Sequence, residues 1–186
     1  SIGETLLKVT DLSTNKGIRH VSFEVRGGEI VGLAGLMGSG RTEVTRAIFG
    51  IDRITSGTIE LNGRPYAPKS AKDAMSHAVA LVPEDRREQG LVVSHSVRDN
   101  LTLTRLNECR SSGLLSTRKI EKIASDLIRR FSIKVDDQAA PASQLSGGNQ
   151  QKIVIAKWLG REPDLLIMDE PTAGVDIGTK SEVLAN

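Results

Sequence analysis

Apolar and polar residues alternate through the first third of the chain, and this alternation predicts β-strands. Residues 21–26 follow the period of two that is typical of a half-buried strand. Residues 58–62 do the same and run into Asn62-Gly63, a pair that favours a tight hairpin turn. We therefore expect an antiparallel β region near the amino terminus.

Three short apolar runs lack this alternation and predict a different kind of strand. They are residues 30–34, 79–82 and 165–168. A continuous apolar run of this length suits a strand that is buried on both faces of a parallel sheet. Between the second and third runs, residues 86–144 are polar and mostly helical in pattern. The layout predicts an α/β core that is interrupted by a helical insertion.

Two segments carry the spacing of amphipathic helices. Residues 44–48 place apolar side chains at helical intervals, and Gly50 stands where such a helix would end. Residues 120–131 form a longer apolar stripe, with Ser116 or Thr117 as the expected N-cap.

Composition narrows the classes of function. The 186 residues suit one globular domain, and aromatic residues, at 3%, are too few for a base-stacking platform. The net charge of +2 comes from well-mixed signs, so we expect no nucleic-acid partner. Because no apolar run approaches the length of a membrane span, we expect any membrane association to come through a partner. Cys109 is the single cysteine, which excludes a disulfide within the chain.

The first candidate for chemistry is a glycine-rich loop between a predicted strand and a predicted helix. Residues 35–42 read Gly-Leu-Met-Gly-Ser-Gly-Arg-Thr, which matches a Walker A loop except that Arg41 takes the lysine position. Glycines let successive backbone N–H groups curl around phosphate oxygens at a helix N-terminus. The Thr42 hydroxyl is placed to ligate Mg²⁺. A glycine-rich turn that only joins strand to helix has the same composition.

The third apolar run ends in two acids, Asp169 and Glu170. They fall at the carboxyl edge of the predicted sheet, where open α/β folds bind their ligands. Asp169 would hold Mg²⁺ as a Walker B acid does, and Glu170 could polarise the attacking water as a general base. A solvated acidic turn is the alternative, and the glycine loop in the same chain weighs against it.

A second glycine-rich motif lies upstream of that run. Residues 145–150 read Leu-Ser-Gly-Gly-Asn-Gln, and they offer a hydroxyl and bare backbone amides at an expected helix start. The motif resembles the LSGGQ signature of ABC ATPases, with Asn149 in place of glutamine. A flexible Ser-Gly linker is the alternative. Residues 153–156 are β-branched enough to favour a strand, and only the resemblance implies a helix there.

Four motifs together resemble one group within the ABC ATPases. They are Gly-Leu-Met-Gly-Ser-Gly-Arg-Thr-Glu at 35–43, Val-Pro-Glu-Asp-Arg-Arg at 82–87, Leu-Ser-Gly-Gly-Asn-Gln-Gln-Lys at 145–152 and Met-Asp-Glu-Pro-Thr at 168–172. The group is the second, carboxyl-terminal ATP-binding domain of the fused ATPase subunits that drive bacterial importers of ribose, galactose, arabinose and xylose. The resemblance runs along the whole chain.

The resemblance implies an α/β fold, namely a P-loop NTPase domain of the ABC type. It combines an antiparallel β subdomain, a parallel-sheet core and a helical insertion. We expect one ATP-binding domain over residues 1–186, with the core and β subdomain over about 1–85 and the helical subdomain over about 86–144. The signature, the Walker B strand and the D-loop would occupy about 145–186.

The resemblance also implies a role for each site residue through its motif position. The nucleotide-binding residues are Gly35, Leu36, Met37, Gly38, Ser39, Gly40, Arg41, Thr42 and Glu43. The signature residues, which complete the site of a partner domain, are Leu145, Ser146, Gly147, Gly148, Asn149 and Gln150. The catalytic residue is Glu170, and the metal ligands are Thr42, Glu84 and Asp169.

The implied cofactors are ATP and Mg²⁺, bound where two ABC domains lie head to tail. The expected partners are a second ABC ATP-binding domain on the same polypeptide, membrane permease subunits and, indirectly, a periplasmic or extracellular sugar-binding protein. We expect a peripheral position on the cytoplasmic face of the bacterial inner membrane. The transported sugar is not encoded in this domain, because specificity lies in the binding protein and the permease.

Three positions depart from the general ABC pattern. Arg41 replaces a lysine, and its planar fork reaches a phosphate differently. Glu84 stands at the Q-loop glutamine, where a carboxylate can still ligate Mg²⁺ but adds negative charge facing phosphate. No aromatic residue lies near Ser13, where the family stacks adenine. We predict weak nucleotide binding and slow hydrolysis at this domain's own Walker loop, with the signature still completing the partner's site.

ABC domains are usually longer, with a switch histidine beyond the Walker B acid. The three histidines, His20, His77 and His95, all lie upstream of that acid. We therefore expect a C-terminally truncated fragment that lacks the core strand between the Walker A and Walker B strands. Such a sheet would leave unpaired backbone groups.

Two alternative functions remain. One is an ABC-type ATPase of DNA maintenance, although the chain shows no sustained heptads for the long coiled coils of that class. The other is a regulatory domain that binds ATP without hydrolysing it. Arg41 and Glu84 favour this second alternative, and the Asp169-Glu170 pair opposes it.

Overall fold

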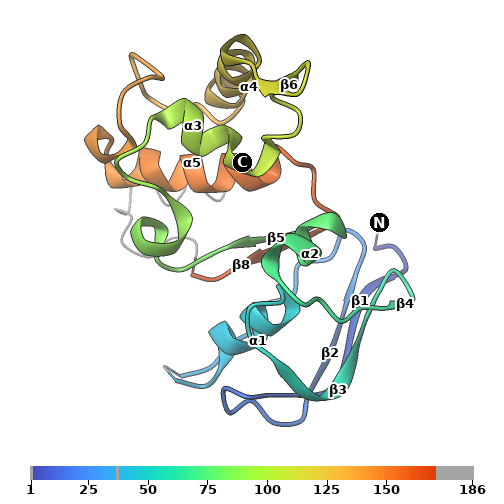
Figure 1. The fold of residues 1–186 in the computed structure, drawn as a ribbon. Helices are drawn as coiled ribbons and strands as arrows, with labels where there is room; N and C mark the ends of the chain where they lie inside the picture. Colours follow the sequence, from blue (N-terminus) through green and yellow to red (C-terminus); the bar gives the residue numbers. More distant parts are fainter. Residues whose placement is uncertain (1, 37, 171–186) are drawn as a thin grey trace. The chain divides into compact units, whose positions relative to one another are not determined.

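The computed structural model describes residues 2–36 and 38–170, which divide into two compact units (Figure 1). The first unit contains the chain up to Leu81 together with Asp164–Asp169. The described part of the second unit contains Val82–Pro163 and Glu170. The described residues of the 35–42 glycine loop and Asp169 therefore belong to the first unit, and the 145–150 motif belongs to the second.

The first unit is built on an antiparallel sheet of order β2-β1-β3-β4. Its strands are β1 (Thr5–Thr14), β2 (Val21–Arg26), β3 (Ile54–Leu61) and β4 (Arg64–Pro65). Val9 at the centre of β1 lies opposite Phe23 on one side and Ile59 on the other. The turn between β3 and β4 is Asn62-Gly63, both with positive φ, as a tight hairpin turn requires. The predicted antiparallel region is confirmed.

Two of the three predicted core strands form and pair with each other. They are β5 (Val79–Val82) and β8 (Leu165–Met168), which make a two-stranded sheet from segments far apart in the sequence. The amides of Asp164 and Leu165 both donate to the carbonyl of Ala78, which fixes where β8 joins β5. All four residues of β5 are buried, as the continuous apolar run predicts.

The remaining predicted core strand, residues 30–34, does not form. Residues 30–34 take no regular secondary structure, and Ile30 is 99% exposed. A strand depends on its neighbours for hydrogen bonds and for burial, and none of the described strands pairs with this segment. The prediction of a buried strand over residues 30–34 is therefore wrong for this structure, because an apolar run cannot supply its own partner.

The first unit also holds two helices, α1 (Arg41–Ile48) and α2 (Ala71–Ser76). Helix α1 has the buried positions that its helical spacing predicts, and it stops at Phe49 just before Gly50, whose φ is 75°. The core of this unit includes Leu7, Val9, Leu12, Ile48 and Ile59, all buried.

The second unit is mainly helical. Its three main helices are α3 (Val97–Thr102), α4 (Thr117–Arg130) and α5 (Gly147–Leu159), each of which contacts the other two. The short elements are the π-helical turn η1 (Arg86–Gly90), the 3-10 turns η2 (Leu103–Arg105) and η3 (Ala142–Gln144), and a hairpin of β6 (Arg110–Ser111) and β7 (Leu114–Leu115). Ser116 caps α4 by accepting from the amide of Lys119, so the predicted cap position is confirmed.

Helix α5 settles the structure of residues 153–156. They are helical and buried, although their β-branched side chains favour a strand. Ser146 caps the start of α5, and packing against α3 and α4 provides burial on several sides. Tertiary packing therefore overrides local preference, and the expectation from the family resemblance holds.

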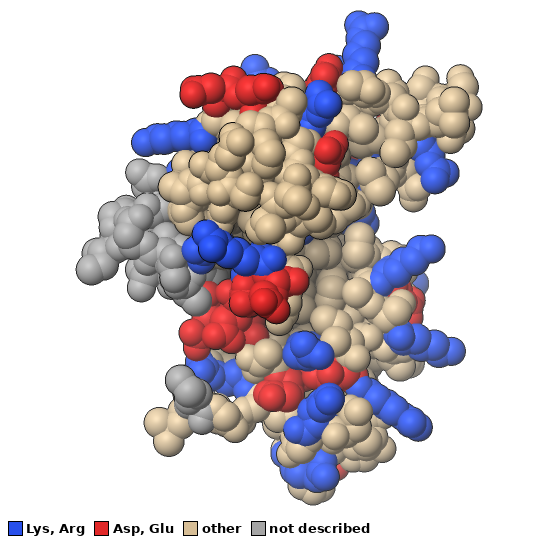
Figure 2. All heavy atoms as spheres, turned by 60° about the vertical axis from the view of Figure 1, so that its left-hand side comes forward, with Lys and Arg blue, Asp and Glu red and all other residues tan. Residues whose placement is uncertain are grey.

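Charged side chains of both signs are interspersed over the face drawn in Figure 2. Within residues 2–36 and 38–170, no helix combines the length and the apolar character that crossing a bilayer requires.

Candidate functional site

The glycine loop ends at the start of α1, and its backbone conformation explains why glycine occupies several of its positions. Gly38 and Gly40 have φ values of 78° and 92°, in the left-handed region that side chains disfavour. The amide of Ser39 donates to Leu36 at 3.0 Å and closes a turn. A Cβ atom on Gly35 would lie only 2.4 Å from Oγ of Ser39. The loop therefore needs glycine at these positions in order to curl. Met37 lies outside the described residues.

No side chain caps the N-terminus of α1. Its N-cap is Gly40, which makes no side-chain hydrogen bond to the first amides of the helix. Uncapped amides and the helix dipole together favour a phosphate group. Arg41 and Thr42 stand in the first turn and are half-buried, followed by Glu43. A Cβ atom on Gly40 would lie 2.1 Å from Cδ1 of Ile18, so the loop before β2 lies against this end of the helix.

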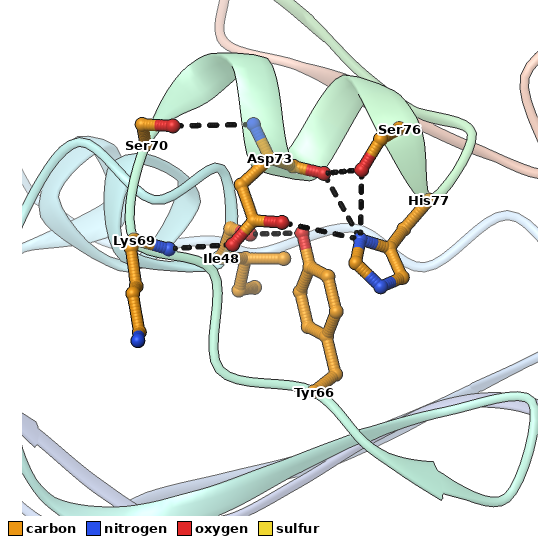
Figure 3. Close-up of polar contacts among 7 residues, drawn as sticks. All are labelled: Ile48, Tyr66, Lys69, Ser70, Asp73, Ser76 and His77. Atoms are coloured by element: carbon orange, nitrogen blue, oxygen red, sulfur yellow. Dashed lines mark hydrogen bonds and ion pairs between the residues drawn. The ribbon is translucent and has the colours of Figure 1, made fainter.

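The other end of α1 is held firmly in place (Figure 3). The hydroxyl of Tyr66 donates to the carbonyl of Ile48 at 2.9 Å. Burial raises the pKa of the Tyr66 phenol, which keeps this group a donor. Arg46 adds an ion pair with buried Asp52, with Nε 2.9 Å from Oδ2. The C-terminal end of α1 is thus fixed, while its N-terminal end offers backbone groups to a ligand.

Helix α2 supports Tyr66 (Figure 3). Ser70 caps α2 by accepting from the amide of Asp73. The ring of His77, just past the helix, meets the ring of Tyr66 edge-on, with centroids 5.5 Å apart. His77 Nδ1 lies 2.9 Å from the carbonyl oxygen of Asp73, which restrains its ring. Helix α2 and His77 therefore hold Tyr66 in place, and Tyr66 in turn holds the C-terminal end of α1. The sequence motifs do not predict this support.

The predicted acids occupy different positions. Asp169 directly follows β8 and is buried, whereas Glu170 is exposed and has a φ of 43°, an uncommon value for a non-glycine residue. Glu84 follows β5 by two residues and is exposed. Together with its neighbours up to Arg87, it lines a hollow in the second unit. Thr42 and Asp169 belong to the first unit, and Glu84 and Glu170 to the second.

The signature forms the capped start of α5. Oγ of Ser146 accepts from the backbone amide of Asn149 at 3.4 Å and from its side-chain amide at 3.1 Å. Oδ1 of Asn149 in turn accepts from the amide of Lys134 at 2.8 Å. Ser146 stays exposed, and Leu145 and Gly147 are half-buried. The signature is therefore a pre-formed surface that its own unit holds in place.

Gln150, the last predicted signature residue, faces the interior. It is fully buried, and its side-chain amide donates to the carbonyl of Ala142 at 3.0 Å. The sequence does not predict the hydrogen bond between Asn149 and Lys134, because these residues lie 15 positions apart and the segment from Lys134 on shows no periodicity.

A family model described as ABC transporter matches residues 18–173. The chain belongs to the ABC transporter family. The predicted fold class, an ABC-type P-loop NTPase, is confirmed.

Relatives of this ABC transporter chain include named sugar-import proteins. The ribose import ATP-binding protein RbsA of Shouchella clausii is 46% identical over 181 residues, which is 97% of this chain and 36% of that protein. The ribose import ATP-binding protein RbsA 3 of Rhizobium meliloti is 47% identical over 186 residues, which is 100% of this chain and 37% of that protein. The chain therefore spans little more than a third of the length of these relatives.

Solved structures share the fold of this ABC transporter chain. The structure of cbiO1 from Clostridium perfringens, part of the ABC transporter complex cbiONQ, has a TM-score of 0.76 at 27% identity. The match covers 98% of this chain and 72% of that one. A nucleotide-free ATP-binding cassette from an ABC transporter has a TM-score of 0.79 at 18% identity, covering 97% of this chain and 75% of that one, and shows likeness of fold alone.

Proposed function

We propose that this chain is an ATP-binding and hydrolysing domain of a bacterial monosaccharide importer, and the second of two such domains in one polypeptide. One observation carries the proposal. The chain holds two glycine-rich helix starts, the Walker loop at α1 and the signature at α5, in two separate compact units. A domain that both binds a nucleotide and completes a partner's site needs both surfaces. The relatives named as ribose import proteins supply the substrate class.

The residues present fit a nucleotide with Mg²⁺. The uncapped amides of α1 and the Arg41 guanidinium would hold phosphate oxygens. The Thr42 hydroxyl and the Asp169 carboxylate of the first unit are hard oxygen donors, which Mg²⁺ prefers, and the carboxylate of Glu84 is a donor of the same kind. When bound, Mg²⁺ neutralises phosphate charge. The carboxylate of Glu170 would orient the attacking water and accept its proton.

The two surfaces of this domain differ in quality. Arg41 and Glu84 weaken the domain's own Walker site, by altered reach and by added negative charge respectively. The signature keeps its serine and both glycines at a well-capped helix start. We therefore assign this domain a larger part in completing the site of its partner than in hydrolysing ATP at its own loop.

The partners and the location follow from the same assignment. A second ABC ATP-binding domain would supply the opposing signature and Walker loop. Permease subunits would bring the domain to the cytoplasmic face of the inner membrane as a peripheral protein, and a sugar-binding protein would act indirectly through them.

A large, charged side chain at Ser146 tests whether the signature completes a partner domain's site. In the complete polypeptide assembled with its permease, Ser146→Arg should abolish most ATP turnover, because the arginine side chain would fill the space of the partner's phosphate. Ser125→Arg on the exposed face of α4 is the matched control and should leave turnover unchanged. Wild-type turnover in the Ser146→Arg variant would show that the composite-site proposal is wrong.

A second variant separates hydrolysis from binding at this domain's own loop. Glu170→Gln removes the proposed base and leaves the phosphate-binding loop intact. If Glu170→Gln lowers ATP turnover without abolishing it, this site contributes to ATP hydrolysis. Unchanged turnover with retained nucleotide binding identifies a site that binds without hydrolysing.

A further inference from the structure

A buried lysine joins the signature helix to the turn that follows β5. Lys157 on α5 is 5% exposed, and its ammonium group donates to the carbonyl of Gly90 at 2.5 Å. Gly90 is the last residue of η1. Burying an amino group costs free energy, and an apolar side chain would fill the same space without that cost. The ammonium group also lies over the ring of Trp158, 5.8 Å from its centroid, but that contact stays within α5. The contact with Gly90 is the one that a lysine adds between α5 and η1.

Two further contacts lie on the same face of α5. Nε of Arg87 donates to Oε1 of Gln150 at 3.4 Å. A Cβ atom on Gly90 would come within 2.9 Å of Cγ2 of Val154, so the backbone of η1 lies directly on the helix. Gln150, Val154 and Lys157 follow each other at intervals of four and three residues, the spacing of one helix face. Turn η1 therefore lies along α5 and is tied to it at three successive positions.

Turn η1 is also capped at its N-terminal end, by Asp85. The carboxylate of Asp85 accepts from the amides of Arg87 and Glu88 at 2.9 and 3.0 Å. Glu84 directly precedes this cap. A shift of η1 along or away from α5 would therefore move Glu84 with it.

The two ends of this arrangement matter to the proposed function. Ser146 begins α5, and Lys157 lies eleven residues further on, about 16 Å along the helix at 1.5 Å per residue. A helix transmits displacement over such a length as a rigid element. The segment that contacts the far end of α5 is therefore the one that moves with it.

We propose that Lys157 is a positioning residue that fixes η1 to the signature helix, so that movement of Ser146 is carried to Glu84 and the residues of η1. The inference rests on the proposed function, since closing on a partner's nucleotide gives Ser146 its reason to move. In this role Lys157 acts through α5 and η1 and not on the nucleotide itself. It makes the start of α5 and the turn after β5 move together.

Lys152 provides a matched control on the same helix. It is 7% exposed, and its ammonium group donates to the carbonyl of Ser132 at 3.4 Å. The variants are Lys157→Met, which keeps the apolar stem and removes the donor, Lys157→Arg, which keeps a donor, and Lys152→Met. All are made in the complete polypeptide assembled with its permease and binding protein in lipid vesicles.

Two quantities are measured: sugar taken up per ATP hydrolysed, and hydrogen exchange at the amides of Gln89 and Gly90. Lys157→Met should lower uptake per ATP by about fivefold or more, the usual lower range for coupling between sites. It should also speed exchange at both amides. Lys157→Arg should restore uptake, and Lys152→Met should leave both quantities at wild-type values even if it lowers the melting temperature as much.

Each outcome decides between the proposals. Equal uptake per ATP in Lys157→Met and Lys152→Met would reduce Lys157 to a packing residue. Unchanged exchange at Gln89 and Gly90 in Lys157→Met would overturn the tie itself. If the wild-type assembly shows no ATP-driven uptake, the proposed function fails, and the exchange measurement alone then tests whether Lys157 fixes η1.

Discussion

Helices α1 and α5 both begin at glycine-rich motifs, yet their first turns are built in different ways. Helix α1 begins at Gly40, which has a left-handed backbone and offers no side chain to the amides that follow. Helix α5 begins at Ser146, whose oxygen binds the amide and the side chain of Asn149. Asn149 then reaches across to the backbone of Lys134.

The difference shows what each helix start can do without a ligand. The start of α5 satisfies part of its own hydrogen-bonding need and is pre-formed. The start of α1 has no side-chain cap, and a helix start of this kind is suited to binding an anion. A pre-formed surface suits a motif that docks onto another domain's nucleotide, and an open one suits a loop that wraps phosphate. The four predictions that follow test this contrast, beginning with the largest expected effect.

Gly40→Ala should damage the start of α1 most. The new Cβ would be placed at a φ of 92° and 2.1 Å from Cδ1 of Ile18. Left-handed strain and overpacking together should lower the free energy of unfolding by about 3–4 kcal/mol and abolish nucleotide binding. Gly17→Ala is the control, because Gly17 has a φ of 100° but no atom within 4 Å of the added Cβ. It should cost only the strain, about 1 kcal/mol. Equal losses in the two variants would show that Ile18 does not confine the loop.

The anchoring of α5 predicts a pH dependence. Burial lowers the pKa of Lys157 to about 8 in the folded chain, against the ordinary 10.5 when unfolded. Between these values the unfolded chain binds more protons, so the contribution of Lys157 to the free energy of unfolding rises with pH from 8 to 10.5 and is constant below 8. The rise should reach up to about 3 kcal/mol, since one pKa unit corresponds to about 1.4 kcal/mol.

Urea unfolding of the complete polypeptide from pH 7 to 10.5 measures this dependence. The free energy of unfolding of the wild type should rise with pH relative to that of Lys157→Met. Lys157→Arg should show no such growth relative to Lys157→Met, because arginine stays charged throughout. Parallel curves for the wild type and Lys157→Met would contradict a buried amino group at this position.

Ser146→Ala should remove the cap of α5. The amide of Asn149 would lose its acceptor, at about 1 kcal/mol of stability. Ser116→Ala at the start of α4 removes an equivalent cap and should cost a similar amount. If α5 is a docking surface, ATP turnover of the assembled importer should fall only in the Ser146→Ala variant. A matching fall in Ser116→Ala would trace the loss to stability alone.

Arg41→Lys should have the smallest effect and the opposite sign. A lysine reaches phosphate as a compact charge, so nucleotide affinity should rise by a factor of about 3, worth about 0.7 kcal/mol. Arg41→Gln, which removes the charge, should lower the affinity. Titration with a fluorescent ATP analogue measures both variants. If Arg41→Lys binds the ATP analogue no more tightly than the wild type, Arg41 is not a cause of weak nucleotide binding at this loop.

Much of the candidate site could be predicted because it is local. The Walker loop, the acids after β8 and the signature each occupy a few consecutive residues. Gly38 and Gly40 are recognisable from sequence, since a left-handed turn before a helix calls for glycine. Ser116 as a cap and Asn62-Gly63 as a turn follow from the same short-range rules. The support of α1 by Tyr66 could not be predicted, because the two groups lie 18 residues apart.

By itself, the sequence determined where turns, caps and helix starts fall, because hydrogen bonds and φ preferences act between near neighbours. The tertiary structure decided everything that depends on a distant partner. Residues 30–34 have the composition of a buried strand but no described strand beside them. Residues 153–156 favour a strand but become helical, because the rest of their unit surrounds them. Lys157 has the sequence context of an ordinary helix residue, and only the structure shows that its ammonium group donates a hydrogen bond to the carbonyl of Gly90, 67 positions away. Pairing and burial are properties of two segments at once, and neither segment encodes them alone.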